Sequence, residues 1–220
     1  MNILPGSLWL AYTITSRPAI QSLLPPSLEL SSCSLLQDDA SSFPTPKLLF
    51  NVYTVDAGLT MQGVRTDVLT LARHRRDNTM HLVILDCLTN TLQWNPIDGV
   101  KGPNAYCKQT HRTRRDNASS WVVRTRKDLI MVDAVPGKKR DIDWTFAVEA
   151  NLACYFQNVD RAYTMSFDED EIMQPVRMLR PSQNIINTVW HRHRSRKPSH
   201  VFCHEHPMHF DVHVSSFTKN

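Results

Sequence analysis

The feature that most constrains the fold is a pair of adjacent prolines, Pro25 and Pro26, near the start of the chain. Proline lacks the backbone N–H that helices and central strands need, so the chain turns at this pair or uses it as a simple linker. The pair follows a strand-like run, residues 8–14, and a short segment of helical character, residues 16–23. An extended segment, residues 28–30, comes directly after it.

Strand signals continue along most of the chain. β-branched and aromatic residues gather in short runs, and turn-forming residues separate several of them. The runs that we predict as strands are residues 47–55, 67–72, 80–85, 121–126, 129–134, 146–156, 162–167 and 210–214. Helices are predicted only at residues 16–23 and 168–179, and the second begins with four acidic residues that complement the helix N-terminus. The pattern predicts a mainly β fold.

A length of 220 residues with 41% hydrophobic content suffices for one core. All-β barrels of this size are commonly single domains, so we predict one domain over residues 1–220. No apolar run approaches the roughly 20 residues of a membrane-spanning helix, and the N-terminus lacks a signal-peptide pattern. The five cysteines are scattered without a close pair, which favours reduced thiols. We therefore expect a cytoplasmic protein with no membrane association.

The formal net charge of +4 raises the question of nucleic acid. Basic residues cluster at residues 73–76, 111–115, 138–140 and 191–197. Each cluster lies where a turn is expected, and no zinc-finger, basic-helix or aromatic RNA-binding pattern accompanies it. Solvated turns explain these clusters more simply, so we do not expect nucleic acid as the main partner.

The C-terminal segment, residues 203–213, is rich in histidine and contains one cysteine. Both residue types are good zinc ligands, but Pro207 interrupts the alternation that would bring the histidines to one face. We predict no metal site here. Most of these histidines are expected at the surface, and one of them acting as an acid or base remains an alternative.

The order of strand, helix, proline turn and Leu-Glu-Leu strand, followed by Phe50-Asn51-Val52-Tyr53 and residues 63–68, resembles the N-terminal half of the acetoacetate decarboxylase-like β-barrel superfamily. The strand ending at Asp86 and the segment over residues 98–105 look like the strand and loop that carry the Schiff-base lysine of true acetoacetate decarboxylases. The resemblance implies a mainly β (α+β) fold, a single antiparallel β-barrel or cone with a few short helices.

In that family a lysine with a destabilised ammonium attacks a ketone as a neutral amine. The resemblance gives this role to Lys101, with Arg65 and Asn51 as further catalytic candidates. Arg65 would hold a carboxylate or enolate, unless a neighbouring aspartate, Asp67 or Asp86, simply neutralises it. The substrate-binding candidates are Phe50, Tyr53, Trp94 and His209. The family needs no dissociable cofactor, so none is predicted.

Two departures from the family pattern bear on the reaction. Asn51 stands where the decarboxylases carry a glutamate, and an amide cannot exchange protons as a carboxylate does. The arginine expected ahead of the first strand is absent from residues 5–7. We therefore predict a cofactor-independent lyase, cyclase or decarboxylase-type enzyme of specialised metabolism, acting on a keto acid or polyketide-like substrate. The alternative is a non-catalytic barrel that binds a small ligand, and nucleic-acid binding is a weaker alternative. A homo-oligomer is compatible with each of these functions.

Overall fold

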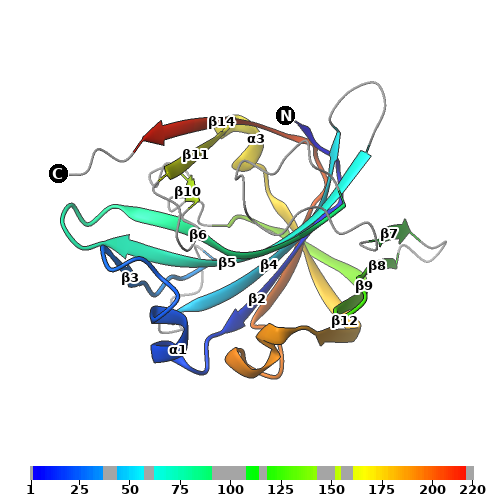
Figure 1. Cartoon of the computed structure of the whole chain (residues 1–220). Coiled ribbons are helices and arrows are strands. Elements are labelled where there is room, and N and C mark those ends of the chain that lie inside the picture. Colours follow the sequence, from blue (N-terminus) through cyan, green and yellow to red (C-terminus); the bar gives the residue numbers. More distant parts are fainter. Residues whose placement is uncertain are drawn as a thin grey trace.

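The computed structural model describes residues 2–36, 44–56, 62–90, 108–113, 118–142, 152–154 and 161–216. Within these ranges fourteen strands form one antiparallel sheet, accompanied by short helices (Figure 1). The strands are β1 (Asn2–Ile3), β2 (Ser7–Thr13), β3 (Leu28–Leu30), β4 (Lys47–Asp56), β5 (Gln62–His74), β6 (Met80–Thr89), β7 (Lys108–Thr113), β8 (Ser119–Arg124), β9 (Leu129–Arg140), β10 (Leu152–Cys154), β11 (Arg161–Phe167), β12 (Val176–Asn187), β13 (His200–His204) and β14 (Met208–Ser216). The helices are α1 (Arg17–Gln21), α3 (Glu169–Ile172) and the 3-10 helix η1 (Val189–His193).

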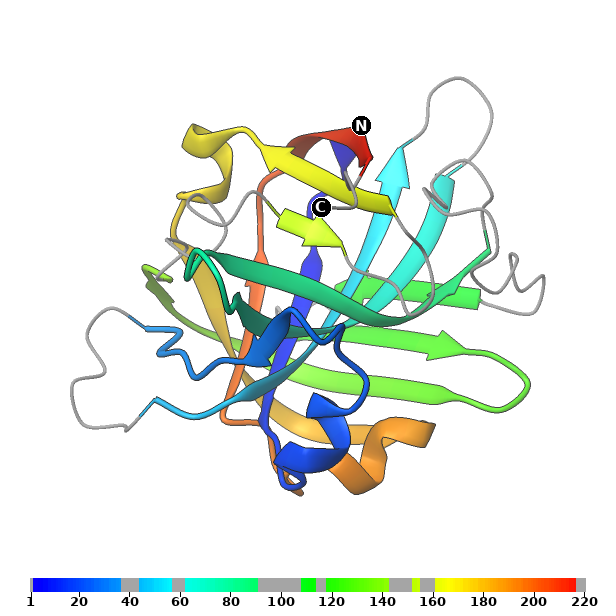
Figure 2. The ribbon, with the colours of Figure 1, turned by 60° about the vertical axis from the view of Figure 1, so that its left-hand side comes forward.

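Strand β4 organises the sheet. One edge of β4 pairs with β5, and the other edge pairs with β2 and, further along, with β1. The full order is β10-β11-β14-β1-β4-β2-β13-β12-β9-β8-β7, with β5 joining β4 to β6 and β3. Two arms therefore leave β4: an upper arm of β1, β14, β11 and β10, and a lower arm that begins with β2 and β13. Figure 2 shows β10 and β11 crossing above β6, so the sheet wraps into a cone-like shape.

The two arms separate at Gly6, between β1 and β2. Gly6 has a φ of 96°, a backbone conformation that only glycine adopts without strain. Its N–H donates to the carbonyl of His204 at 2.8 Å, which holds β2 to β13 just where β1 departs toward β14. The bend thus lets one continuous edge of β4 serve two layers of the structure.

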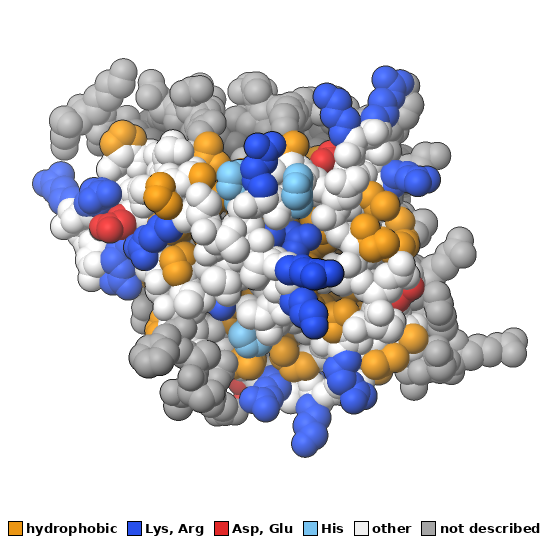
Figure 3. Space-filling model, turned by 90° about the horizontal axis from the view of Figure 1, so that it is seen from below, with side chains coloured by type: hydrophobic (Ala, Val, Ile, Leu, Met, Phe, Trp, Pro, Cys, Tyr) orange, Lys and Arg blue, Asp and Glu red, His pale blue; other side chains and the backbone are white. Residues whose placement is uncertain are grey.

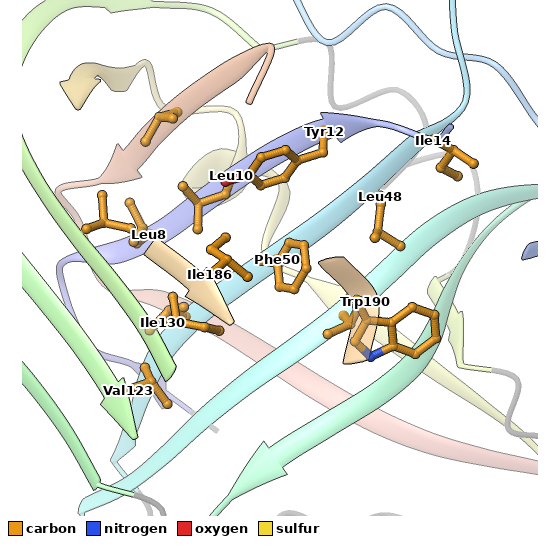
Figure 4. Packing of buried hydrophobic residues seen from close by; sticks show 14 of the residues in the cluster. Leu8, Leu10, Tyr12, Ile14, Leu48, Phe50, Val123, Ile130, Ile186 and Trp190 are labelled. Atoms are coloured by element: carbon orange, nitrogen blue, oxygen red, sulfur yellow. The ribbon is translucent and has the colours of Figure 1, made fainter. Parts of the chain in front are cut away.

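Both faces of the central strands are buried. Alternate residues of β2 and β4 point to opposite faces, and each face has its own core. The lower core contains Leu8, Leu10 and Phe50 packed against strands of the lower arm, α1 and η1 (Figure 4). The upper core contains Trp9, Leu49, Tyr53, Leu69 and Phe202 and is closed by β1, β14 and α3. A strand with two buried faces reads as a nearly continuous apolar run, as β4 does.

Most predicted elements are confirmed, with the region over residues 146–156 described only at β10. The predicted helix over residues 168–179 is wrong beyond its first turn: α3 ends at Ile172, Pro175 prevents its continuation, and β12 begins at Val176. Strands β1, β7, β12 and β13 were not predicted. The described helices include none with the length and hydropathy needed to cross a bilayer.

The basic clusters lie in different kinds of structure. The expected turn at residues 73–76 is confirmed only for Arg75 and Arg76, because Arg73 and His74 are the last residues of β5. The expected turn at residues 111–115 is wrong at its start, because His111 and Arg112 belong to β7. The expected turn at residues 138–140 is wrong, because these are the last residues of β9. Residues 191–197 form the end of η1 and the loop after it. Seen from below, lysine and arginine side chains are spread over that face with few acidic groups among them (Figure 3).

Candidate functional site

A band of polar side chains crosses the otherwise apolar upper-core face of β4, β5 and β6. Directly paired residues of neighbouring strands project to the same face, so cross-strand register identifies the members. The two paired rows are Asn51, Asp67 and Cys87, and Tyr53, Arg65 and Thr89. All six residues are buried. We call these six residues the polar band.

Asp67 is the hub of the polar band. Its carboxylate accepts hydrogen bonds from Arg65 Nε at 2.8 and 3.0 Å, and Oδ2 accepts a third from the Tyr53 hydroxyl at 2.7 Å. Arg65 is only 1% exposed, so a charge partner is essential for its burial. Asp67, one of the two counter-ions predicted for Arg65, supplies that charge, and the pair leaves the band without net charge.

The other two titratable members of the band are neutral. Burial raises the pKa of the Tyr53 phenol well above its usual value, and the neighbouring Asp67 charge raises it further. Burial likewise raises the pKa of the Cys87 thiol. Tyr53 is therefore a fixed hydrogen-bond donor, and Cys87 is not a thiolate nucleophile at neutral pH. The band is a surface of neutral and paired hydrogen-bonding groups.

Asn51 presents a positioned donor. The hydroxyl of Ser7, which is fully buried, donates to Asn51 Oδ1 at 2.9 Å and so fixes the amide orientation. No residue of the described chain accepts a hydrogen bond from Asn51 Nδ2. Trp9 lies directly across from Asn51 on β2, and its indole stacks on Phe202 with centroids 6.0 Å apart. A donor amide thus sits beside a flat apolar wall.

His204 joins this face from β13. It pairs in register with Ser7, so its side chain projects to the side of Asn51, and it is 1% exposed. Burial lowers the pKa of His204 to about 4, with a smaller contribution from His206. The imidazole is neutral at physiological pH. The alternation of β13 alone would have pointed His204 inward together with Phe202, but that strand was not recognised in the sequence.

His204 makes stability depend on pH. Its folded pKa of about 4 lies below the ordinary value of 6.5, so the unfolded chain binds the proton more readily. We expect the neutral, buried His204 to contribute at most about 3 kcal/mol to the free energy of unfolding. This contribution is fully present above about pH 6.5 and is lost as the pH falls toward 4. Urea unfolding across this range should show a smaller pH slope for His204→Gln. An unchanged slope in His204→Gln would contradict the assignment.

The structure brings together three of the predicted site residues, Asn51, Tyr53 and Arg65. Phe50 points into the lower core, edge-on to the ring of Tyr12 at 5.7 Å. His209 is exposed, with Nδ1 2.6 Å from a carboxylate oxygen of Glu171. We therefore leave Phe50 and His209 out of the proposed site. The predicted residues Lys101 and Trp94 lie outside the described residues.

Sequence reasoning missed the supporting members of the site. Ser7, Cys87 and His204 had no predicted role there, and Asp67 was considered only as a counter-ion. A second lysine that could be considered, Lys47, donates to Ser199 Oγ at 3.4 Å, away from the polar band. Among the described residues, no group of three or more histidine, cysteine, aspartate or glutamate side chains could hold a metal ion.

Comparison with known proteins gives a fold. No protein-family model matches the sequence, and no curated protein is similar to it. Among solved structures, acetoacetate decarboxylase from Legionella pneumophila aligns with a TM-score of 0.54 at 12% identity, over 98% of this chain and 86% of that one. The enduracididine biosynthesis enzyme MppR complexed with pyruvate aligns with a TM-score of 0.59 at 11% identity, over 99% and 91%. MppR with the condensation product of pyruvate and imidazole 4-carboxaldehyde gives 0.51 at 10% identity, over 99% and 90%.

These alignments cover nearly the whole chain and agree with the mainly antiparallel architecture described above. The low identities mean that they bear on the arrangement of strands and not on individual residues. The chain has a divergent acetoacetate decarboxylase-like fold, in which the described strands form a cone-like sheet that is not closed into a barrel.

Proposed function

We propose that the protein is an enzyme that binds a small keto acid, or a larger polyketide-like ketone, against the polar band inside the cone. The reaction is a lyase, cyclisation or decarboxylation step that needs no dissociable cofactor. The observation that carries this proposal is the polar band itself, six buried hydrogen-bonding residues on one face of an apolar sheet. Buried polar groups are costly, and their concentration at one place is typical of a binding site.

Asn51 is the residue of the band best suited to contact substrate. Its oxygen is engaged by Ser7, so its amide N–H groups are available to a carbonyl, enolate or carboxylate oxygen. Donors that are oriented before the reaction stabilise developing negative charge without a reorganisation cost. Arg65 adds positive charge nearby, and Asp67 holds its guanidinium in place. The arrangement supports stabilisation of an enolate in a neutral, low-dielectric surrounding.

Lys101 is our candidate for covalent catalysis. A neutral lysine amine would condense with the substrate ketone and release water, and the protonated imine would then withdraw electrons from the neighbouring carbon. Carbon dioxide could leave from that carbon, or a proton could be removed from it. One structural neighbour, MppR, is complexed with pyruvate in one structure and with the condensation product of pyruvate and imidazole 4-carboxaldehyde in another, which supports keto acids as the first compounds to test.

Borohydride trapping tests this proposal. We expect incubation with pyruvate or a longer 2-keto acid, followed by borohydride, to add the mass of the reduced ligand to one lysine. The adduct should be lost in Lys101→Ala and retained in Lys47→Ala, since Lys47 is bonded to Ser199. Labelling of Lys47, or equal labelling of all lysines, would overturn the role of Lys101.

The same experiment separates an enzyme from a ligand carrier. A protein that only carries an apolar ligand would bind keto acids or ketones without forming an adduct and without releasing a product. Turnover without trapping would instead point to catalysis by the hydrogen bonds of the polar band. The proposed function would be refuted if the protein neither bound nor converted any keto acid or ketone.

A further inference from the structure

A pocket opens on the lower-core side of the sheet, where the lower arm leaves the bend at Gly6. Its volume is about 510 Å³, within the range of sites that hold small organic molecules. It is formed by the segment before β2 together with β8, β9, β12 and the end of β13. The lining residues are Pro5, Gly6, Ser119, Trp121, Pro136, Gly137, Arg177, Leu179, Cys203 and Glu205.

This pocket is separate from the polar band. On β13, Phe202 stacks on Trp9 in the upper core, whereas the next residue, Cys203, belongs to the lower core and lines the pocket. Successive residues of a strand point to opposite faces, so the pocket and the band lie on opposite sides of β2 and β13. A ligand here would not contact Asn51 or Arg65.

The floor of the pocket is apolar and well fixed. Trp121 and Leu179 are lower-core residues, and the indole Nε1 of Trp121 donates to the carbonyl of Gly6 at 3.0 Å. Burial raises the pKa of the Cys203 thiol to about 12, so this side chain is also uncharged. Two prolines complete the apolar lining. A flat or branched hydrocarbon group would therefore find contacts along the floor.

The rim of the pocket carries charge. Arg177 donates to both carboxylate oxygens of Glu205, at 3.0 and 3.1 Å, and Lys139 Nζ lies 3.5 Å from the same carboxylate. A third bond, from Arg177 Nη1 to the carbonyl of Gly137 at 3.2 Å, anchors the guanidinium. The hydrogen bonds and charges of these cations lower the pKa of Glu205, which keeps it ionised. Two cations around one carboxylate leave one net positive charge at the rim.

We propose that this pocket binds a small organic monocarboxylate with an aromatic or branched apolar body. The apolar part lies on Trp121 and Leu179, and the carboxylate lies at the rim near Arg177 and Lys139. Charge complementarity selects the anion, because a cation would meet a net positive rim. The site does not depend on the proposed function, since it shares no residue with the polar band.

The proposal is tested by measuring the binding of phenylacetate to the full chain with NMR or calorimetry. We expect phenylacetate to bind at least about tenfold more tightly than phenethylamine, which has the same ring and the opposite charge. Arg177→Gln should weaken phenylacetate binding about tenfold. Glu205→Gln should strengthen it about two- to fivefold, because the two cations lose their competing carboxylate.

The two substitutions are expected to change phenylacetate affinity in opposite directions. If Arg177 and Glu205 formed only a structural ion pair, either substitution would disturb it, and both would change binding in the same direction. Asn51→Ala should leave phenylacetate binding unchanged, since Asn51 lies on the other side of the sheet. Equal affinity for the amine, weaker binding in Glu205→Gln, or loss of binding in Asn51→Ala would overturn the proposal. A Ser119→Phe substitution at the pocket wall should block phenylacetate, and continued tight binding would also count against the site.

Discussion

Replacing Asp67 with alanine is expected to lower the free energy of unfolding by about 3–5 kcal/mol. The substitution removes both hydrogen bonds of Arg65 Nε to the carboxylate and leaves a guanidinium that is 1% exposed without its counter-charge. It also removes the acceptor of the Tyr53 hydroxyl at a fully buried position. Urea unfolding followed by tryptophan fluorescence measures the loss, with the midpoint shifted and the slope unchanged.

Two comparisons show whether the charge is the cause. Glu29→Ala removes a carboxylate that is 55% exposed and 3.6 Å from Arg75, and should cost about 0–1 kcal/mol. The double substitution Arg65→Met with Asp67→Leu removes both charges and should be less harmful than Asp67→Ala alone. A double variant as unstable as the single one would show that packing, and not the buried cation, dominates at this position.

The strands could be predicted where one short run of apolar residues is bounded by turn signals, as for β4 and β6. Strand β12 escaped prediction because an acidic run and Pro175 precede it and Pro181 interrupts it, and no local preference marks the segment as extended. It forms a strand through its long pairing with β9. Tertiary pairing of this kind is invisible in a single sequence.

The site could be predicted only as far as alternation along one strand allows. Asn51 and Tyr53 are two residues apart and share the upper-core face of β4. Phe50 immediately precedes Asn51, so it points to the opposite face and into the lower core. That Asp67 meets Arg65 and Tyr53 depends on the register of β4 with β5, which sequence spacing does not determine. That His204 projects to the side of Asn51, and the predicted His209 does not, depends on where β13 ends and β14 begins, which is also a property of the folded sheet.

The second large effect concerns catalysis. For a keto acid that the protein converts or traps, we expect Asn51→Ala to lower kcat/KM about 10²-fold, the usual cost of losing one oriented donor to a developing oxyanion. Steady-state kinetics measures this effect, with unfolding curves showing that the variant remains folded. Removing the orienting hydroxyl with Ser7→Ala should lower kcat/KM by a smaller factor, because the amide remains but is free to rotate.

Asn184→Ala is the matched control for this substitution. Its amide donates to the hydroxyl of Tyr12 at 2.8 Å, on the lower-core side of the sheet, so the same chemical change is made on the other face. It should leave kcat/KM unchanged while costing some stability. If Asn184→Ala and Asn51→Ala reduced kcat/KM equally, the loss would come from weakened packing of the sheet. If Asn51 is a substrate-binding donor on the upper-core face, kcat/KM falls strongly in Asn51→Ala, falls less in Ser7→Ala and is unchanged in Asn184→Ala.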